Sequence, residues 1–286
     1  MSIHLNCLLS HKRVASLGTW LVLAAMLAWP VHASPTIVTL TDGGSTATID
    51  LSSSAGMNSW TVNDQNQLNQ QWFWYRTDGG LAQPINSIGG LQYQVIGNNV
   101  LDAIYQNNQL SVEITYTLTG GGVNSGSADM TEQIMAVNLS GSAFDLNFYQ
   151  YSNFNLLGVA NDNVQIFGGP GNYNYVRQWN GSTAIQEAVT APSAFYAEAA
   201  VVNQTLNEFG SVPNLTLNGN LTAGPGDVTW ALQWDSTLAA NGGEFDLTKD
   251  KSLSISVVPE PASTALAVVG GLCLVGWTVR RHHSLS

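Results

Sequence analysis

Residues 110–118 read LSVEITYTL, with an apolar side chain at every second position and a polar side chain between each pair. A period of two is typical of a β-strand that buries one face. The residues expected on the buried face are Leu110, Val112, Ile114, Tyr116 and Leu118. Asn107-Asn108, just before this run, favours a turn, and the apolar run 100–105 precedes it. The segment therefore predicts a β-hairpin.

The same alternation recurs along much of the chain. It is clear at residues 228–234, where Val228, Trp230, Leu232 and Trp234 alternate with smaller or polar residues. Further runs are 37–41, 46–51, 71–76, 91–96, 133–139, 144–151 and 253–257. Glycine-rich turns separate these runs, and the pattern of residues 191–208 is ambiguous and allows one short helix. Many short strands with frequent turns predict an all-β protein, a single antiparallel β-sandwich of about ten or more strands with jelly-roll-like connections.

The two ends of the chain differ from this pattern. Residues 1–33 have a basic start, an uncharged apolar stretch and small residues before Ser34, so we expect a secretory signal peptide that signal peptidase cleaves between Ala33 and Ser34. Residues 262–279 form a second uncharged apolar stretch, which as a helix would rise about 27 Å and span a bilayer. Arg280 and Arg281 follow it as a basic stop. Basic residues at both outer ends predict that residues 34–258 are exported.

Pro259-Glu260-Pro261 stands directly before the apolar stretch, and the basic tail 280–286 ends the chain. This order over residues 258–286 resembles the PEP-CTERM sorting signal. The resemblance implies an inner-membrane-tethered precursor in a Gram-negative bacterium that makes exopolysaccharide. It also implies an exosortase as partner, which would cut near the motif and release the protein to the cell surface or extracellular matrix. The alternative is an ordinary C-terminal membrane anchor.

The composition of residues 34–258 excludes several functions. The whole chain has 286 residues and a net charge of −11, and this predicted domain holds only four basic residues against eighteen acidic ones. A nucleic-acid binder needs a basic face, which this domain lacks. Every His and Cys of the chain lies outside residues 34–258. Catalysis by Ser-His-Asp or Cys-His groups and metal sites built from His or Cys are therefore excluded in this domain.

Carboxylate chemistry stays open. Paired Asp or Glu side chains cleave glycosidic bonds when their carboxyl groups lie roughly 5–9.5 Å apart. The candidates, which we expect on exposed strand faces, are Glu113, Asp129, Glu132, Asp227 and Asp235. Nothing in the sequence pairs any two of them, and an acidic surface that keeps an exported protein soluble explains them equally well. The sequence favours this second interpretation.

We expect no cofactor, with calcium as the one candidate. Asp42 in the turn Asp42-Gly43-Gly44 and the cluster Asn161, Asp162 and Asn163 offer oxygen ligands. Neither has the spacing of an EF-hand, and turns rich in Asn and Asp need no metal.

Aromatic residues offer a possible glycan platform. Residues 72–75 read WFWY, and Trp60 lies upstream. Trp60, Trp72 and Trp74 on an exposed face would stack against sugar rings, and a second cluster comprises Tyr149, Tyr151, Tyr173, Tyr175 and Trp179. The alternative is core packing, which the large buried area of aromatic side chains favours.

The sequence as a whole predicts an exported, non-catalytic surface or matrix protein that associates with exopolysaccharide or biofilm. The alternative is a carboxylate-dependent glycan hydrolase or lyase that acts on the same matrix. A lyase fits less well, because the domain has few cationic groups to neutralise a uronate.

Overall fold

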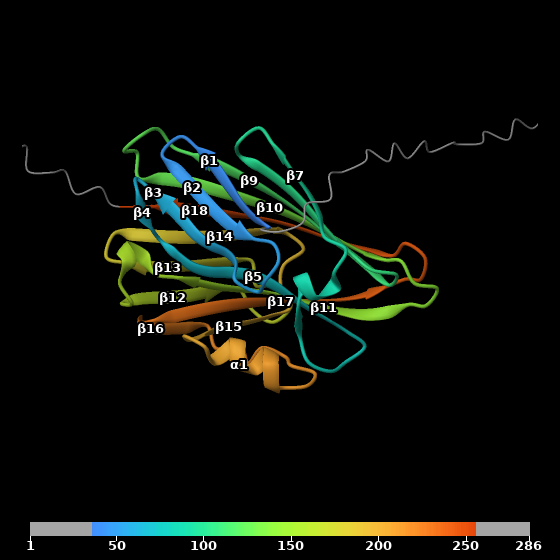
Figure 1. The fold of residues 1–286 in the computed structure, drawn as a ribbon. Coiled ribbons are helices and arrows are strands. Elements are labelled where there is room, and N and C mark those ends of the chain that lie inside the picture. Colours follow the sequence, from blue (N-terminus) through green and yellow to red (C-terminus); the bar gives the residue numbers. More distant parts are fainter. Residues whose placement is uncertain (1–35, 256–286) are drawn as a thin grey trace, which may run out of the picture.

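The computed structural model describes residues 36–255, which fold into two β-sheets packed face to face with one α-helix on the outside (Figure 1). Sheet A runs in the order β1 (Ile37–Asp42), β2 (Ser45–Asp50), β3 (Gly56–Val62), β5 (Leu68–Thr77), β11 (Phe144–Phe154), β17 (Val228–Leu238) and β15 (Tyr196–Val201), with β4 (Gln65–Asn66) on β3 and β6 (Gln83–Pro84) on β5. Sheet B runs in the order β16 (Thr222–Gly226), β12 (Asp162–Phe167), β13 (Tyr175–Asn180), β14 (Thr183–Ala191), β18 (Glu244–Ser254), β10 (Ser127–Asn138), β9 (Leu110–Gly120), β8 (Val100–Gln106) and β7 (Gln92–Ile96).

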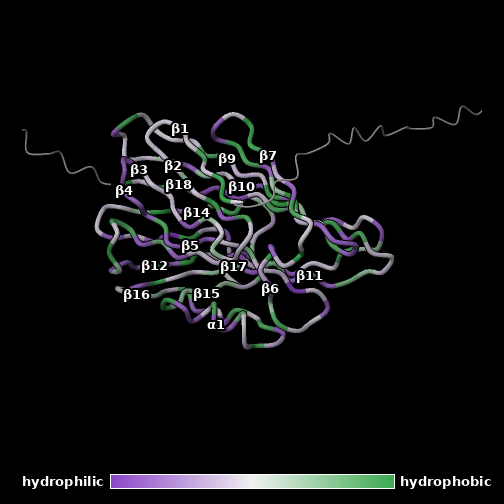
Figure 2. Tube along the Cα trace, in the orientation of Figure 1, coloured by the Kyte–Doolittle hydropathy of each residue, from purple (hydrophilic) through white to green (hydrophobic). Residues whose placement is uncertain are grey.

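The prediction of an all-β sandwich is confirmed. The run 110–118 lies in β9, and the five residues expected on its inner face are buried. β9 pairs with β8 as an antiparallel hairpin in which Tyr105 lies opposite Val112. Hydrophobic and hydrophilic residues alternate along such strands (Figure 2).

The connections differ from those of a jelly roll. The consecutive strands β7 to β10 are neighbours in sheet B, as are β12 to β14, so much of the chain forms hairpin meanders. A jelly roll instead combines two Greek keys. The sheets are antiparallel except for a short parallel contact between β3 and β5, where Gly56 lies opposite Gln71.

Aromatic side chains fill the space between the sheets. Phe73 on β5 stacks on Phe148 of β11, with ring centroids 5.5 Å apart, and Phe148 packs against Phe245 of β18 in the opposite sheet at 6.0 Å. Phe154 stacks on Trp230 within sheet A. This packing fixes which face of β11 points inward and therefore which residues of that strand point outward.

Helix α1 (Gln204–Ser211) covers part of the outer face of sheet A (Figure 1). Thr205 and Phe209, one helical turn apart, are buried against the sheet. The Phe209 ring stacks on Trp74 at 5.0 Å and meets Tyr149 at 5.3 Å. The ambiguous segment 191–208 thus contains a strand, β15, followed by the start of this helix. Two 3₁₀ turns, η1 (Ile85–Ile88) and η2 (Leu156–Gly158), complete the elements.

The predicted terminal signals lie outside residues 36–255. They are the signal peptide and its cleavage site, the Pro259-Glu260-Pro261 motif, the apolar stretch 262–279 and the basic tail. Within the described part of the chain, no helix has the length and apolar character needed to cross a membrane.

Candidate functional site

A polar cavity of about 590 Å³ lies at the end of the outer face of sheet A. Its size is within the range of about 300–1,000 Å³ that small-molecule sites occupy. Strands β5, β11 and β17 form its floor, and the segment after α1 forms one wall. The lining residues are Arg76, Asp78, Gly79, Asp145, Leu146, Asn147, Asn214, Asp235, Ser236 and Thr237.

Three side chains form a row across the floor. Asn147 on β11 lies directly opposite Arg76 on β5 and directly opposite Asp235 on β17. Asn147 Oδ1 accepts hydrogen bonds from Arg76 Nε at 3.1 Å and Nη2 at 2.7 Å. Asn147 Nδ2 donates to Asp235 Oδ1 at 2.6 Å. The row places a cation and a carboxylate on either side of one amide.

Asp145 adds a second carboxylate to the floor. It lies two residues before Asn147, so both side chains are on the outer face of β11. Its Oδ1 accepts a hydrogen bond from Thr237 Oγ1 at 2.7 Å. Thr237 is its direct partner on β17, which makes Asp235 its diagonal neighbour. Diagonal neighbours across antiparallel strands lie about 7–8 Å apart, with their Cβ atoms somewhat closer.

Arg76 is the unusual member of the site. Its side chain is 8% exposed, yet no carboxylate of the described residues forms an ion pair with it. A guanidinium group has five N–H donors, and three of these bond amide oxygens, the third being Nη1 to Asn214 Oδ1 at 3.4 Å. The positive charge is therefore held beside the cavity by neutral groups and remains available to a ligand rich in oxygen atoms.

The wall that carries Asn214 is held to the sheet by polar contacts. Asn214 has a left-handed backbone conformation (φ 55°), and its backbone N–H donates to the Gly80 carbonyl at 2.8 Å. The Gly80 N–H donates back to Asn214 Oδ1 at 3.2 Å. Farther along the wall, the Leu217 N–H donates a hydrogen bond to Gln233 on β17. The Gln233 side chain in turn donates to Asp235 Oδ1 at 2.8 Å. Asp235 is thus fixed from two sides.

Tyr149 lies under the wall, next to the row. Its hydroxyl group donates to the Leu215 carbonyl at 2.9 Å. Burial raises the pKa of Tyr149 to about 12, with the Arg76 charge opposing the increase and the Asp235 charge adding to it. Tyr149 is therefore neutral at neutral pH and serves as a hydrogen-bond donor that anchors the wall.

The structure separates the carboxylates that the sequence singled out. Asp235 lines the cavity. Glu113 lies on the outer face of sheet B, in a second cavity of about 410 Å³ that also includes Asp246. Burial, followed by the charge of Asp102, raises the pKa of Glu113. Asp129 is half-buried on β10. Asp227 directly precedes β17, and its Oδ1 is buried and has no hydrogen-bond partner among the described residues.

The prediction that Glu132 lies on an exposed strand face is wrong. Its side chain is fully buried between the sheets, in contact with Lys249 and Lys251. The sequence contained evidence that Glu132 is buried. Met130 and Ile134, two residues away on either side, are the apolar positions of the same strand. Alternation therefore put Glu132 on the inner face.

The three tryptophans do not form the exposed glycan platform that we considered; they pack in the interior, which is the alternative. Trp60 and Trp72 are completely buried and Trp74 is 5% exposed. Trp72 packs on Tyr105 of sheet B, and Trp74 lies under Phe209 of α1. Both faces of this part of β5 are covered, so no exposed pair of rings forms.

The second aromatic cluster is dispersed. Tyr149, Tyr151 and Tyr173 are buried, whereas Tyr175 and Trp179 are half-buried on β13. Arg177 lies over the Trp179 ring at 5.2 Å from its centroid. These residues do not form one surface.

The calcium candidates have partners of their own. Asp42 Oδ2 accepts a hydrogen bond from the Gly120 N–H at 2.8 Å. Asp162 is buried, and its Oδ2 accepts from Leu156 N and Gln178 Nε2. Burial raises the pKa of Asp162. Among residues 36–255, no three His, Cys, Asp or Glu side chains gather as a metal site would require.

Sequence reasoning missed Arg76, Asp145, Asn147 and Asn214. Two signals pointed to part of this set. Arg76 is one of four basic residues in the predicted domain and ends an aromatic run, and Asp145 and Asn147 are the polar positions of an alternating strand. Their proximity depends on pairing between strands 71 residues apart, which the sequence does not show.

The fold is shared with two solved structures, a glucoamylase and a galactose mutarotase related enzyme. No protein-family model matches the chain, and no curated protein sequence matches it. A bacterial glucoamylase solved in complex with acarbose matches with a TM-score of 0.55 and 9% identity, over 85% of this chain and 35% of the glucoamylase. This chain therefore spans about a third of that enzyme's length. A galactose mutarotase related enzyme from Lactobacillus acidophilus matches with a TM-score of 0.51 and 9% identity, over 78% of this chain and 98% of the enzyme.

These matches contradict the prediction of a non-catalytic surface protein. Nearly the whole of the mutarotase-related enzyme has a counterpart in the sandwich described here, so the fold of this chain is one that an enzyme also has. The prediction that the chain is not an enzyme is corrected on the same ground. At 9% identity the likeness shows the fold alone, and the activity has to be argued from this chain's own residues.

Proposed function

We propose that this protein is a carbohydrate-processing enzyme whose active site is the polar cavity on sheet A. The observation that carries the proposal is the row Arg76–Asn147–Asp235 with Asp145 beside it. Its amide, guanidinium and carboxylate groups are those that hydrogen-bond sugar hydroxyl groups, and the cavity has the volume of a small-molecule site. The sugar enzymes that share the fold support the proposal.

The reaction that the two carboxylates support best is hydrolysis of a glycosidic bond. Inverting glycosidases place their carboxyl groups about 6.5–9.5 Å apart, which leaves room for the attacking water. Asp145 and Asp235 are diagonal neighbours about 7–8 Å apart on the outer face of the sheet, and the proposal requires their carboxyl groups to be separated by a distance in this range. One aspartate protonates the leaving oxygen, while the other takes a proton from water on the opposite face of the sugar.

Arg76 and the two asparagines position the sugar. Arg76 offers unused N–H donors to ring or hydroxyl oxygens, and Asn147 fixes the direction in which the guanidinium group points. Asn214 closes one side of the cavity. Holding the glycosidic bond beside the two aspartates contributes a large part of the rate acceleration, because it removes the entropy cost of bringing the reacting groups together.

The site of action is proposed from the sequence alone. The predicted signal peptide and the PEP-CTERM resemblance support an enzyme that is exported, tethered by residues 262–279 until an exosortase cuts near Pro259-Glu260-Pro261, and then released. Exopolysaccharide of the producing cell is the substrate that this route favours. The low basic content of residues 34–258 favours a neutral polymer over a uronate.

The test is an assay of new reducing ends on neutral oligosaccharides, with product anomers identified by NMR. We expect the wild-type protein to release product of inverted configuration. Asp145→Asn and Asp235→Asn keep the oxygen that accepts each structural hydrogen bond and should each lower the rate by about 10²–10⁴-fold.

Asp129→Asn on sheet B is the matched control and should retain the full rate. Rates for Asp145→Asn and Asp235→Asn that equal the control would contradict the assigned site. Acceleration of sugar mutarotation, with all glycosidic bonds left intact, would contradict hydrolysis and leave the cavity as a mutarotase site.

A further inference from the structure

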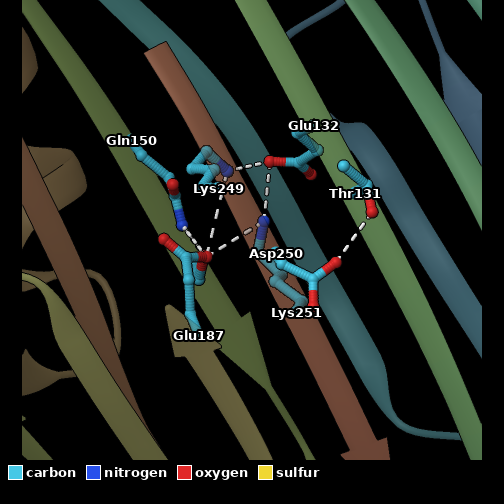
Figure 3. Close-up of polar contacts among 8 residues, drawn as sticks. Thr131, Glu132, Gln150, Glu187, Lys249, Asp250 and Lys251 are labelled. Carbon is cyan, nitrogen blue, oxygen red and sulfur yellow. Dashed lines mark hydrogen bonds and ion pairs between the residues drawn. The ribbon is translucent and has the colours of Figure 1, made fainter. Parts of the chain in front are cut away.

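Four ionisable side chains meet between the sheets, on the face of sheet A opposite the proposed active site. Lys249 and Lys251 on β18 lie between Glu132 on β10 and Glu187 on β14, and all four are fully buried (Figure 3). Lys249 is the direct cross-strand partner of Glu132, and Lys251 is that of Glu187. These are the only two lysines between residues 34 and 258.

The contacts define which groups can react. Lys249 Nζ is in direct contact with Glu132 Oε2. Lys251 Nζ lies 2.7 Å from the same oxygen and 3.0 Å from Glu187 Oε2. Glu187 Oε2 is also 3.8 Å from Lys249 Nζ and accepts a hydrogen bond from Gln150 Nε2 at 2.8 Å. Both amines therefore touch the Glu132 carboxyl group, Lys249 most closely, and the Glu187 carboxyl group lies beside both amines.

The surroundings favour neutral groups over charges. The Phe73 ring lies 4.9 Å from Lys249 Nζ, and no side chain of the cluster reaches solvent. Burial, and after it the charge of Lys251, lowers the pKa of Lys249 well below its usual value. Burial raises the pKa of Glu187. Moving a proton from Lys249 to Glu132 leaves the net charge of the cluster at zero and removes two buried charges, which are costly in an apolar interior.

We propose that Lys249 and Glu132 form an intramolecular isopeptide bond that covalently joins β18 to β10. Glu132 carries its proton on Oε1, and the neutral Lys249 amine attacks Cδ of this carboxyl group. The new N–C bond forms, the bond from Cδ to Oε1 breaks, and one water molecule leaves. Glu187 takes the proton from Nζ and gives it to the departing oxygen, so atoms and charges balance without any cofactor or oxidant.

The surrounding hydrogen-bonding groups fit the amide product better than they fit four charged side chains. Glu132 Oε1 is buried and has no hydrogen-bond partner among the described residues, and this is the oxygen that leaves. The retained Oε2 keeps its hydrogen bond from Lys251. The new amide N–H faces Glu187 Oε2, and Lys251 with Glu187 remains as one paired set of charges. Direct contact within a rigid sheet also supplies the high effective concentration that amide formation needs.

The test is peptide mapping of the full, purified protein after denaturation and digestion with chymotrypsin. We expect one branched peptide that joins the segments containing Glu132 and Lys249, with a mass one water molecule below the sum of the two. Recovery of both segments as separate linear peptides, accounting for all of the protein, would overturn the proposal. This result needs no variant, so it does not depend on how a substitution folds.

Variants then test the assignment of the atoms. Lys249→Met keeps the cluster neutral, with Glu132 protonated, and should yield only linear peptides; a Glu132-linked peptide that persists would show that Lys249 is not the amine. Glu187→Gln should lower the rate constant of linkage, followed as the linked fraction against time after synthesis, by about 100-fold or more, since Gln cannot carry the proton. Linkage at the wild-type rate in Glu187→Gln would contradict the proton transfer.

Discussion

Arg76 and Asp235 stand on opposite sides of β11 and are joined through a single amide, because Asn147 accepts two hydrogen bonds from the guanidinium group and donates one to the carboxylate. The arrangement keeps two opposite charges in one site without letting them neutralise each other. A direct ion pair would occupy the groups that contact the sugar in the proposed function. The amide between them therefore preserves the capacity of both to bind.

Changing Asn147 separates structure from function. Asn147→Ala leaves the buried Arg76 donors without their main acceptor, and we expect the free energy of unfolding to fall by about 1–3 kcal/mol. Asn147→Asp restores an acceptor for Arg76 but places a negative charge against Asp235. Urea denaturation should show near-normal stability for Asn147→Asp, while its hydrolytic rate falls. Full activity in Asn147→Asp would contradict the role of the neutral amide.

Helix α1 should stabilise both the fold and the site. Phe209 fills the space between Trp74 and Tyr149, so Phe209→Ala should lower the free energy of unfolding by about 3–5 kcal/mol. The wall that carries Asn214 begins where this helix ends, and activity at temperatures where the variant is folded should also fall. Leu206→Ala, on the same helix but only partly buried, is the control and should cost less. Equal losses for the two variants would contradict the packing described here.

The tryptophans of β5 should matter for stability and not for binding. Trp72 is completely buried, so Trp72→Ala should lower the free energy of unfolding by about 3–5 kcal/mol. Calorimetric titration with oligosaccharide, at a temperature where the variant is fully folded, should give the wild-type affinity. A loss of affinity with unchanged stability would show that the ring faces a ligand after all.

Asp162 gives a dependence of stability on pH. Its pKa is raised above the usual 3.8, mainly by burial, so the folded state binds a proton more readily than the unfolded state. This contribution to stability is complete below about pH 3.8 and is lost as pH rises through the folded-state pKa. At neutral pH the buried carboxylate is therefore unfavourable.

Asp162→Asn should consequently be more stable than wild type at pH 7, because Asn keeps an oxygen for Leu156 N and Gln178 Nε2. The difference between the two proteins should shrink as pH falls toward 4. Thermal unfolding measured from pH 4 to pH 8 checks this. A variant that is less stable at pH 7, and whose deficit does not change with pH, would indicate that the carboxylate is needed in its charged form.

Period-two alternation predicted the strands that bury one face. β8 and β9 follow it closely, because their outer faces meet solvent. β11 does not, since Phe148 to Phe154 are all buried once α1 and the segment after it cover the outer face of sheet A. A strand buried on both faces carries no alternation to read, which is why the aromatic run of β5 was ambiguous.

The candidate site was only partly predictable, because it depends on register. The sequence identified Asp235 as a candidate, but residues 34–258 contain eighteen acidic residues and nothing set it apart from the others. Its relation to Asp145 and Arg76 arises from antiparallel pairings of β5, β11 and β17 that bring together residues 71 and 88 positions apart. Local patterns fix which face a side chain occupies, but only the register fixes which side chain lies opposite it.

If Asp145 and Asp235 form a glycan-cleaving pair, the protein should shorten the exopolysaccharide of the cell that produces it. Size-exclusion chromatography with light scattering, which follows the molar mass of that polymer over time, measures this. The polymer mass should fall with wild-type protein and stay constant with the Asp145→Asn, Asp235→Asn double variant. A polymer mass that stays constant with both proteins, or falls equally with both, would contradict it.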